Sequence, residues 1–117
     1  MSSDAPSQDL ITDALTLLER IKDTGKIRRG TNEVTKALER GTALMVFIGG
    51  DVSPPEIIRH LPLLAKEKDV AYLEVPSSEI LGKSAGLDVP SASIAVADAG
   101  SSEAELRSII ERVKQFN

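Results

Sequence analysis

Residues 26–41 read Lys-Ile-Arg-Arg-Gly-Thr-Asn-Glu-Val-Thr-Lys-Ala-Leu-Glu-Arg-Gly. The basic run over 26–29 predicts a short strand, and the apolar spacing that follows predicts a helix from Gly30-Thr31 to Arg40. Gly41 ends that helix. A strand followed at once by a helix that opens with an amide and a carboxylate presents polar side chains at a fixed place. This stretch is therefore either a helix cap or a binding site.

The basic charge of the chain is concentrated around this stretch. The whole sequence has 14 Lys and Arg against 18 Asp and Glu, a net charge of −4. Between Arg20 and Gly41, seven basic residues oppose three acidic ones, so this segment carries +4 and the remainder −8. Screening limits the reach of an exposed charge to about 8 Å, so a local patch can bind a polyanion on an acidic protein. The alternative is a solvated basic surface.

The composition excludes several kinds of site. The chain has no Cys, which rules out disulfides, thiolate metal sites and a cysteine nucleophile, and its single histidine, His60, rules out a multi-histidine metal site. No apolar run approaches the roughly twenty residues of a membrane helix, and the polar N-terminus lacks a signal-peptide pattern. We expect a cytoplasmic protein of one domain over residues 1–117, with no cofactor, no bound metal and no membrane partner.

Helix and strand patterns alternate along the rest of the chain. Ser53 and Ser102 each precede a glutamate by three residues, which we interpret as two capping boxes at helix starts. Alternating elements predict an α/β protein with helices on both faces of a central sheet. We expect helices over about 7–23, 53–60 with a further turn to 68, 77–82 and 102–116, and strands over 42–48, 70–74 and 93–97.

Three side chains at the start of the second helix could form a binding site. Asn32 and Glu33 project from its first turn, and Lys36 lies roughly on the same face. An amide donates and accepts, a carboxylate accepts and an ammonium donates, so together they can read the edge of a guanine. The glycine before the helix would let a ligand approach the backbone. The alternative is that Thr31 or Asn32 caps the helix while Lys36 is solvated.

Other candidate residues lie in turns and loops. Gly49-Gly50-Asp51 follows a buried strand, where α/β proteins bind ligands, so Asp51 could serve a nucleotide or metal site or could only close the turn. No GxGxxG or Walker-type pattern accompanies it. His60 is interpreted as a packed or capping residue. Leu87 and Val89, on either side of Asp88, either enter the core or form an exposed apolar shelf for an unstacked base.

Several separated motifs resemble those of the ribosomal protein L7Ae family of kink-turn RNA-binding proteins. Residues 30–36, followed by Glu39-Arg40-Gly41, resemble the family signature. Supporting stretches occur in the family's order and spacing, and the resemblance extends over about residues 25–97. These stretches are Asp51-Val52-Ser53-Pro54 with Glu56-Ile57, His60-Leu61-Pro62-Leu63-Leu64, and Leu81-Gly82-Lys83 with Gly86-Leu87.

The resemblance implies a three-layer α/β/α sandwich around a small mixed four-stranded sheet. It also implies binding to the kink-turn, a bent RNA element with tandem sheared G·A pairs. Asn32, Glu33 and Lys36 would contact the guanines. Basic residues of the preceding strand would lie along phosphates, and loop 87–89 would cover the extruded nucleotide. The RNA-binding residues implied in this way are Lys26, Arg28, Arg29, Gly30, Thr31, Asn32, Glu33, Lys36, Arg40, Leu87, Asp88 and Val89.

The same resemblance implies a non-catalytic scaffold on which ribonucleoproteins assemble. Archaeal members of the family serve in the large ribosomal subunit and in box C/D and H/ACA guide ribonucleoproteins, and some join ribonuclease P. The expected partners are kink-turn RNA and other ribonucleoprotein proteins, and we expect a monomer when free. Two alternatives stay open: a small nucleotide- or metal-binding domain using the Gly-Gly-Asp turn, and a protein-interaction module with a basic face.

Overall fold

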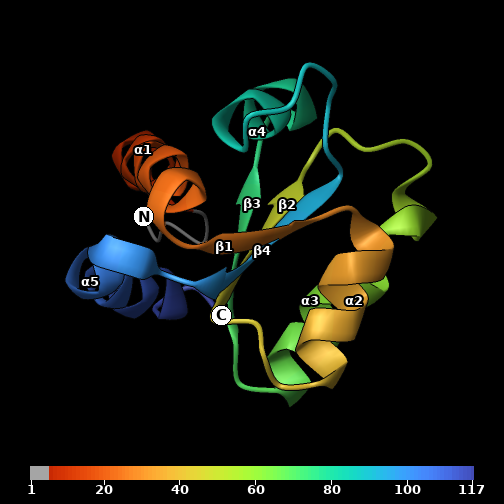
Figure 1. The fold of residues 1–117 in the computed structure, drawn as a ribbon. Coiled ribbons are helices and arrows are strands. Elements are labelled where there is room, and N and C mark those ends of the chain that lie inside the picture. The colour runs from red at the N-terminus through yellow and green to blue at the C-terminus, as the bar shows by residue number, and fades with distance from the viewer. Residues whose placement is uncertain (1–5) are drawn as a thin grey trace.

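The computed structural model describes residues 6–117, in which a four-stranded sheet lies between two layers of helices (Figure 1). This arrangement confirms the predicted three-layer α/β/α sandwich. The helices are α1 (Gln8–Thr24), α2 (Thr31–Glu39), α3 (His60–Glu67), α4 (Ser78–Ser84) and α5 (Glu103–Lys114). The strands are β1 (Lys26–Arg29), β2 (Met45–Gly49), β3 (Ala71–Val75) and β4 (Ser93–Asp98). Two 3₁₀ turns, η1 (Pro55–Ile57) and η2 (Gly100–Ser102), precede α3 and α5.

The sheet is mixed, with the strand order β1-β4-β2-β3. β4 pairs antiparallel with both β1 and β2, whereas β2 and β3 are parallel. Arg29, the last residue of β1, pairs with Ile94 near the beginning of β4. The start of α2 therefore lies beside the start of β4, and this neighbourhood brings together the candidate site.

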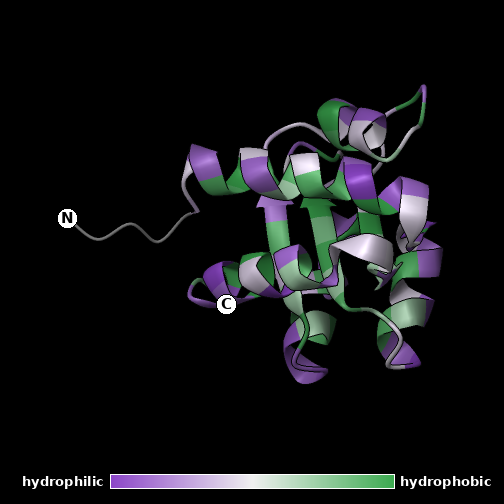
Figure 2. Ribbon diagram, turned by 60° about the vertical axis from the view of Figure 1, so that its left-hand side comes forward, coloured by the Kyte–Doolittle hydropathy of each residue, from purple (hydrophilic) through white to green (hydrophobic). Residues whose placement is uncertain are grey.

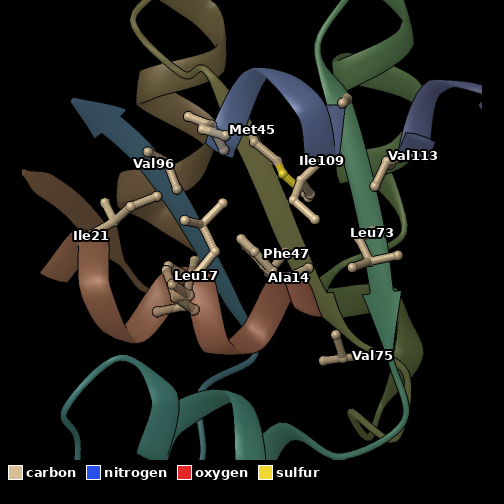
Figure 3. Close-up of a cluster of buried hydrophobic side chains, with 14 of the residues drawn as sticks. Ala14, Leu17, Ile21, Met45, Phe47, Leu73, Val75, Val96, Ile109 and Val113 are labelled. Atoms are coloured by element: carbon tan, nitrogen blue, oxygen red, sulfur yellow. The ribbon is translucent and has the colours of Figure 1, made fainter. Parts of the chain in front are cut away.

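Each face of the sheet has its own apolar core. α1, α4 and α5 pack on one face, around Leu17, Phe47 and Leu73 (Figure 3), and α2 and α3 pack on the other face. Met45 and Phe47 belong to the first cluster, whereas Val46 and Ile48 belong to the second. β2 is therefore buried on both faces, as its continuous apolar run predicted. Figure 2 shows apolar residues concentrated in the strands and on the helix sides that face them.

The predicted helix start at Ser53 is wrong. Residues 55–57 form only the 3₁₀ turn η1, and α3 begins at His60. The cause is the Pro54-Pro55 pair, because a proline disfavours helical backbone at the residue before it. Pro54 is accordingly extended, with φ −74° and ψ 149°. The strand predicted from residue 42 also begins later, at Met45.

The later start of β2 and the missing side-chain cap of α5 both have local causes. The amides of Thr42 and Ala43 donate to the carbonyl oxygen of Ala37 at 2.9 and 3.2 Å, so they complete the end of α2 instead of joining the sheet. α5 starts where predicted, but the Ser102 side chain makes no capping bond within residues 6–117, because η2 leads directly into the helix.

None of the helices within residues 6–117 has both the length and the apolar character of a membrane-spanning helix.

Candidate nucleic-acid interface

The first turn of α2 leaves its backbone open. Gly30 is the N-cap residue, with φ +95° and ψ 147°, a conformation that glycine adopts readily and L side chains rarely do. A Cβ placed on Gly30 would meet no described atom within 4 Å. The predicted cap by Thr31 or Asn32 is wrong, because the helix begins at Thr31 and has no side-chain capping bond from residues 6–117. Backbone and side chains here are both accessible to a ligand.

The structure brings together the polar side chains predicted for this helix start. Glu33 Oε2 and Lys36 Nζ are 3.5 Å apart, and each side chain is 53% exposed. Asn32 is exposed beside them in the first turn. Exposed ion pairs of this kind contribute little to stability, so a ligand can replace the pairing at small cost. Arg40 lies just beyond the other end of α2, about 10 Å along the helix axis from Glu33.

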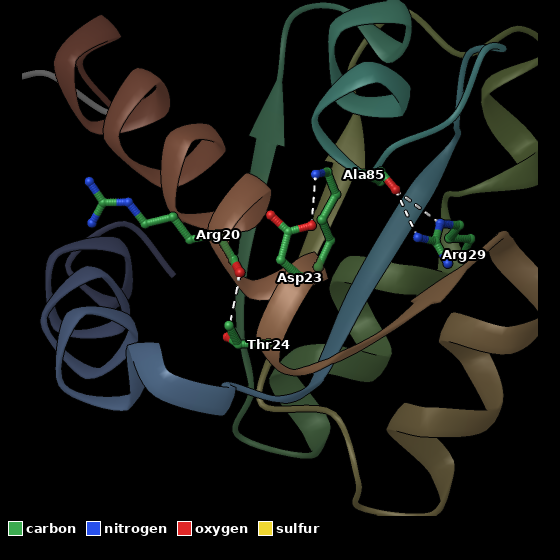
Figure 4. A network of polar contacts seen from close by, with 6 residues as sticks. Arg20, Asp23, Thr24, Arg29 and Ala85 are labelled. Atoms are coloured by element: carbon green, nitrogen blue, oxygen red, sulfur yellow. Dashed lines mark hydrogen bonds and ion pairs between the residues drawn. The ribbon is translucent and has the colours of Figure 1, made fainter.

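The basic residues of β1 have two different environments. Lys26 and Arg28 are exposed. Arg29 is exposed as well, but it donates two hydrogen bonds, from Nε at 3.1 Å and from Nη2 at 2.8 Å, to the carbonyl oxygen of Ala85 (Figure 4). Sequence reasoning placed Arg29 along phosphates and did not find this contact, because the two residues are 56 positions apart.

The loop that follows α4 has a defined beginning. The amide of Gly86 donates to Lys83 O at 3.0 Å and the amide of Leu87 donates to Gly82 O at 2.8 Å. With Gly86 at φ +82°, these two bonds form a Schellman motif. Beyond it, Leu87 is partly buried and Val89 is 61% exposed. The exposed Val89 agrees with the apolar-shelf interpretation rather than with burial in the core.

Two buried serines join this loop to the start of α2. The carbonyl oxygen of Ser93 accepts from the amide of Gly30 at 3.2 Å and from the hydroxyl of Ser91 at 3.0 Å. The hydroxyls of Thr31 and Ser93 are 3.3 Å apart. Sequence reasoning missed both serines, although a polar Ser93 in an otherwise apolar strand was a usable signal. The helix start and the loop are therefore two parts of one surface.

His60 links the two helices on the α2–α3 side of the sheet. Its Nε2 lies 2.8 Å from the hydroxyl of Thr35, and that hydroxyl donates to the carbonyl oxygen of Thr31 at 2.7 Å. Because the hydroxyl has one proton, His60 Nε2 is the donor in this chain of bonds. His60 is exposed and makes no capping bond to residues 6–117, so its interpretation as a packed or capping residue is not confirmed; its side chain instead links α3 to α2.

Asp51 completes the start of α4. Its Oδ1 accepts a hydrogen bond from the amide of Ser78 at 2.9 Å, and this bond holds the pKa of the Asp51 carboxyl below its ordinary value of 3.8. Across residues 6–117, no three His, Cys, Asp or Glu side chains are grouped so that they could hold a metal ion. The Gly-Gly-Asp turn thus has a structural use.

Comparison with known proteins identifies the family. Residues 12–105 match the ribosomal protein L7Ae/L30e/S12e/Gadd45 family, and the chain belongs to it. Over 113 residues the chain is 46% identical to the large ribosomal subunit protein eL8 of Haloquadratum walsbyi, an alignment that covers 97% of this chain and 93% of that protein. The solved structure of the Giardia lamblia 15.5kD RNA binding protein matches with a TM-score of 0.84 and 27% identity over the whole of both chains. The predicted family is confirmed.

Proposed function

We propose that this chain is a non-catalytic RNA-binding protein that recognises and stabilises kink-turn motifs with tandem sheared G·A pairs. One observation carries the proposal: Asn32, Glu33 and Lys36 are presented on an open helix start, and buried Ser93 joins that start to the loop bearing Val89. Two relatives support it by name, one as a large ribosomal subunit protein and the other as an RNA binding protein.

The side chains of the helix start suit guanine. The Glu33 carboxylate would accept from the donors on the Watson–Crick edge, and the Lys36 ammonium would donate to the O6 and N7 acceptors. A carboxylate facing RNA is repelled by phosphates, so its presence is favourable only where base donors meet it. Asn32 would add a donor and an acceptor at the same edge.

The surrounding residues would supply affinity rather than base recognition. Lys26, Arg28 and Arg40 would pair with phosphates, which makes binding salt-dependent. The open backbone at Gly30 and Thr31 would let the RNA approach closely. The loop of Leu87, Asp88 and Val89 would cover the extruded nucleotide with an apolar contact.

The proposed setting is a ribonucleoprotein. The chain would act as one domain and as a monomer when free, in the cytoplasm, and would bind kink-turns in ribosomal RNA and in box C/D and H/ACA guide RNAs. Ribonuclease P RNA is a further proposed target. Holding the RNA bent would allow other ribonucleoprotein proteins to assemble on the complex. The competing nucleotide- or metal-site hypothesis is not favoured, because the Asp51 carboxylate already accepts from Ser78.

Removing the carboxylate of Glu33 tests the proposal directly. We expect Glu33→Ala to weaken kink-turn binding by more than about 1–3 kcal/mol, the scale of one good base contact. Gel-shift titration with a kink-turn RNA and with the same RNA carrying disrupted G·A pairs gives the measurement. Because the Glu33–Lys36 pair is exposed, the free energy of unfolding of Glu33→Ala, measured by thermal unfolding, should differ from the wild-type value by less than about 0.5 kcal/mol.

Glu39→Ala is the matched control, since Glu39 is an exposed carboxylate near the other end of the same helix. This variant removes the same negative charge and should not weaken binding. Equal binding of the intact and G·A-disrupted RNAs by the wild-type protein would overturn the proposed function. Equal losses for Glu33→Ala and Glu39→Ala would overturn the role given to Glu33.

A further inference from the structure

We infer that Arg29 acts in RNA binding as a positioning residue for the loop over residues 86–90, and not as a phosphate ligand. The inference rests on the proposed function and assigns a different role to one of its basic residues. Arg29 is the last residue of β1, directly before the open start of α2. Its guanidinium contacts the end of α4, directly before the loop. It therefore connects the two parts of the surface.

The acceptor of these bonds is a carbonyl at a helix end. The last carbonyls of a helix lack partners within the helix, and a cation near them is favourable. The Schellman bonds use the carbonyls of Gly82 and Lys83, and Arg29 uses that of Ala85 with both Nε and Nη2. Arg29 thus satisfies the carbonyl oxygen at the point where the chain turns into the loop.

The far end of the loop is held separately. The Ser91 amide donates to Ser78 O at 3.0 Å, and the Ser91 hydroxyl donates to Ser93 O. Gly82 lies directly beneath the loop, since a Cβ there would overlap the carbonyl oxygen of Val89. With the loop tied to α4 and β4, the two Arg29 bonds are its direct side-chain link to β1. The position of Val89 relative to Glu33 therefore depends on Arg29 at one end of the loop and on the Ser91 and Ser93 bonds at the other end.

Arg28 provides a natural contrast in the same strand. Successive side chains of a strand point to opposite faces, so Arg28 points away from the side that Arg29 occupies. Both side chains are exposed, but that of Arg28 has no hydrogen bond or ion pair to any part of residues 6–117, whereas that of Arg29 has two hydrogen bonds. Arg28 is free to meet a phosphate, whereas Arg29 is engaged with the protein.

Hydrogen exchange of the free protein tests the link without RNA. Arg29→Lys keeps the charge but replaces the planar fork with a single ammonium. We expect the amides of Gly86 and Leu87 to exchange roughly threefold to tenfold faster in Arg29→Lys, in keeping with the loss of one hydrogen bond of ordinary net strength, because the lysine keeps the charge. Arg28→Lys should leave them unchanged, and the Lys68 amide, bonded to Leu64 O in α3, is the internal reference. The inference would be overturned if the Gly86 and Leu87 amides exchanged at the wild-type rate in both Arg29→Lys and Arg29→Gln.

The salt dependence of kink-turn binding separates positioning from phosphate contact. For Arg29→Lys we expect an affinity about threefold to tenfold lower at every salt concentration, with the wild-type slope of log affinity against log salt. Arg28→Ala should reduce that slope by about 0.7–0.9, the value for one phosphate contact. Wild-type affinity in Arg29→Lys, together with a reduced slope in Arg29→Ala, would show a phosphate ligand and overturn the inference. Failure of the wild-type protein to prefer kink-turn RNA would overturn the proposed function instead, and the exchange data, which need no RNA, distinguish the two failures.

Discussion

The helices α2 and α4 both begin where a strand ends, yet their first turns are completed differently. At α4, the Ser77 hydroxyl accepts from the amide of Ile80 at 3.2 Å, and the Asp51 carboxylate accepts from the amide of Ser78 at 2.9 Å. At α2, the N-cap is Gly30, and no side chain in the described part of the molecule caps the first turn. At α4, side chains accept hydrogen bonds from backbone amides of the first turn. At α2, the amides of the first turn have no side-chain acceptor among the described residues, so they can bond to solvent or to a ligand.

This difference shows why one start is structural and the other is suited to binding. Side chains that cap a helix are fixed against the backbone and are lost to a ligand. Glu33 and Asn32 are exposed and make no such cap. The two N-cap residues differ in type, because Ser77 has a hydroxyl that caps α4 whereas Gly30 has no side chain that could cap α2. The tertiary fold adds a second difference, since it places the Asp51 carboxylate at the start of α4.

Substituting Gly30 should give the largest loss of stability among the changes that probe this comparison. We expect Gly30→Ala to lower the free energy of unfolding by about 1–3 kcal/mol, because the φ of +95° strains any L side chain. No overlap contributes, since the space around the missing Cβ is open. Urea denaturation gives the measurement. If Gly30→Ala were as stable as the wild-type protein, the backbone at residue 30 must relax from its positive φ, and the uncapped start of α2 would not require glycine.

Truncating one polar side chain at each helix start should lower stability at α4 and leave it nearly unchanged at α2. Ser77→Ala should cost about 1 kcal/mol of unfolding free energy, because the Ile80 amide loses its acceptor. Asn32→Ala is the matched variant at α2 and should change stability by less than about 0.5 kcal/mol, since its side chain caps nothing. The midpoints of denaturant unfolding of the two variants, measured at one pH, give both changes in unfolding free energy. Equal losses in the two variants would contradict the contrast between the helix starts.

Much of the fold was predictable because its signals are local. The apolar spacing of α1 and the continuous apolar run of β2 depend on neighbouring residues, and the structure places both elements within a few residues of the prediction. The helix expected at Ser53 failed at the Pro54-Pro55 pair, where one proline prevents helical backbone at the other. The strand order β1-β4-β2-β3 joins distant segments, and no local pattern specifies it.

The candidate site likewise has features that local sequence predicts and features that depend on contacts between distant residues. The grouping of Glu33 with Lys36 follows from helical spacing, so sequence alone predicted it. The bond between Arg29 and Ala85 joins residues 56 apart, and the contact of Thr31 with Ser93 joins residues 62 apart. These contacts depend on β1 lying beside β4, which is a property of the sheet order. The grouping of Glu33 with Lys36 was thus predictable from sequence, but the hydrogen-bond network around the helix start was not.

The smallest expected effect concerns the anion that completes α4. The hydrogen bond from Ser78 lowers the folded-state pKa of Asp51 below 3.8, so the folded protein binds this proton less readily than the unfolded chain. The stabilisation is therefore fully present above the ordinary pKa and is lost as the pH falls through the lower folded value. Asp51→Asn should reduce the denaturation midpoint at about pH 7 and approach the wild-type midpoint as the solution is acidified toward about pH 2. The exposure of the carboxylate keeps the difference below that of Ser77→Ala. If the difference between the wild-type and Asp51→Asn midpoints stays constant or grows on acidification, the Asp51 carboxylate does not stabilise the start of α4. The Ser77 hydroxyl would then be the one side-chain cap of α4 among the described residues, and α4 would differ from α2 only by that hydroxyl.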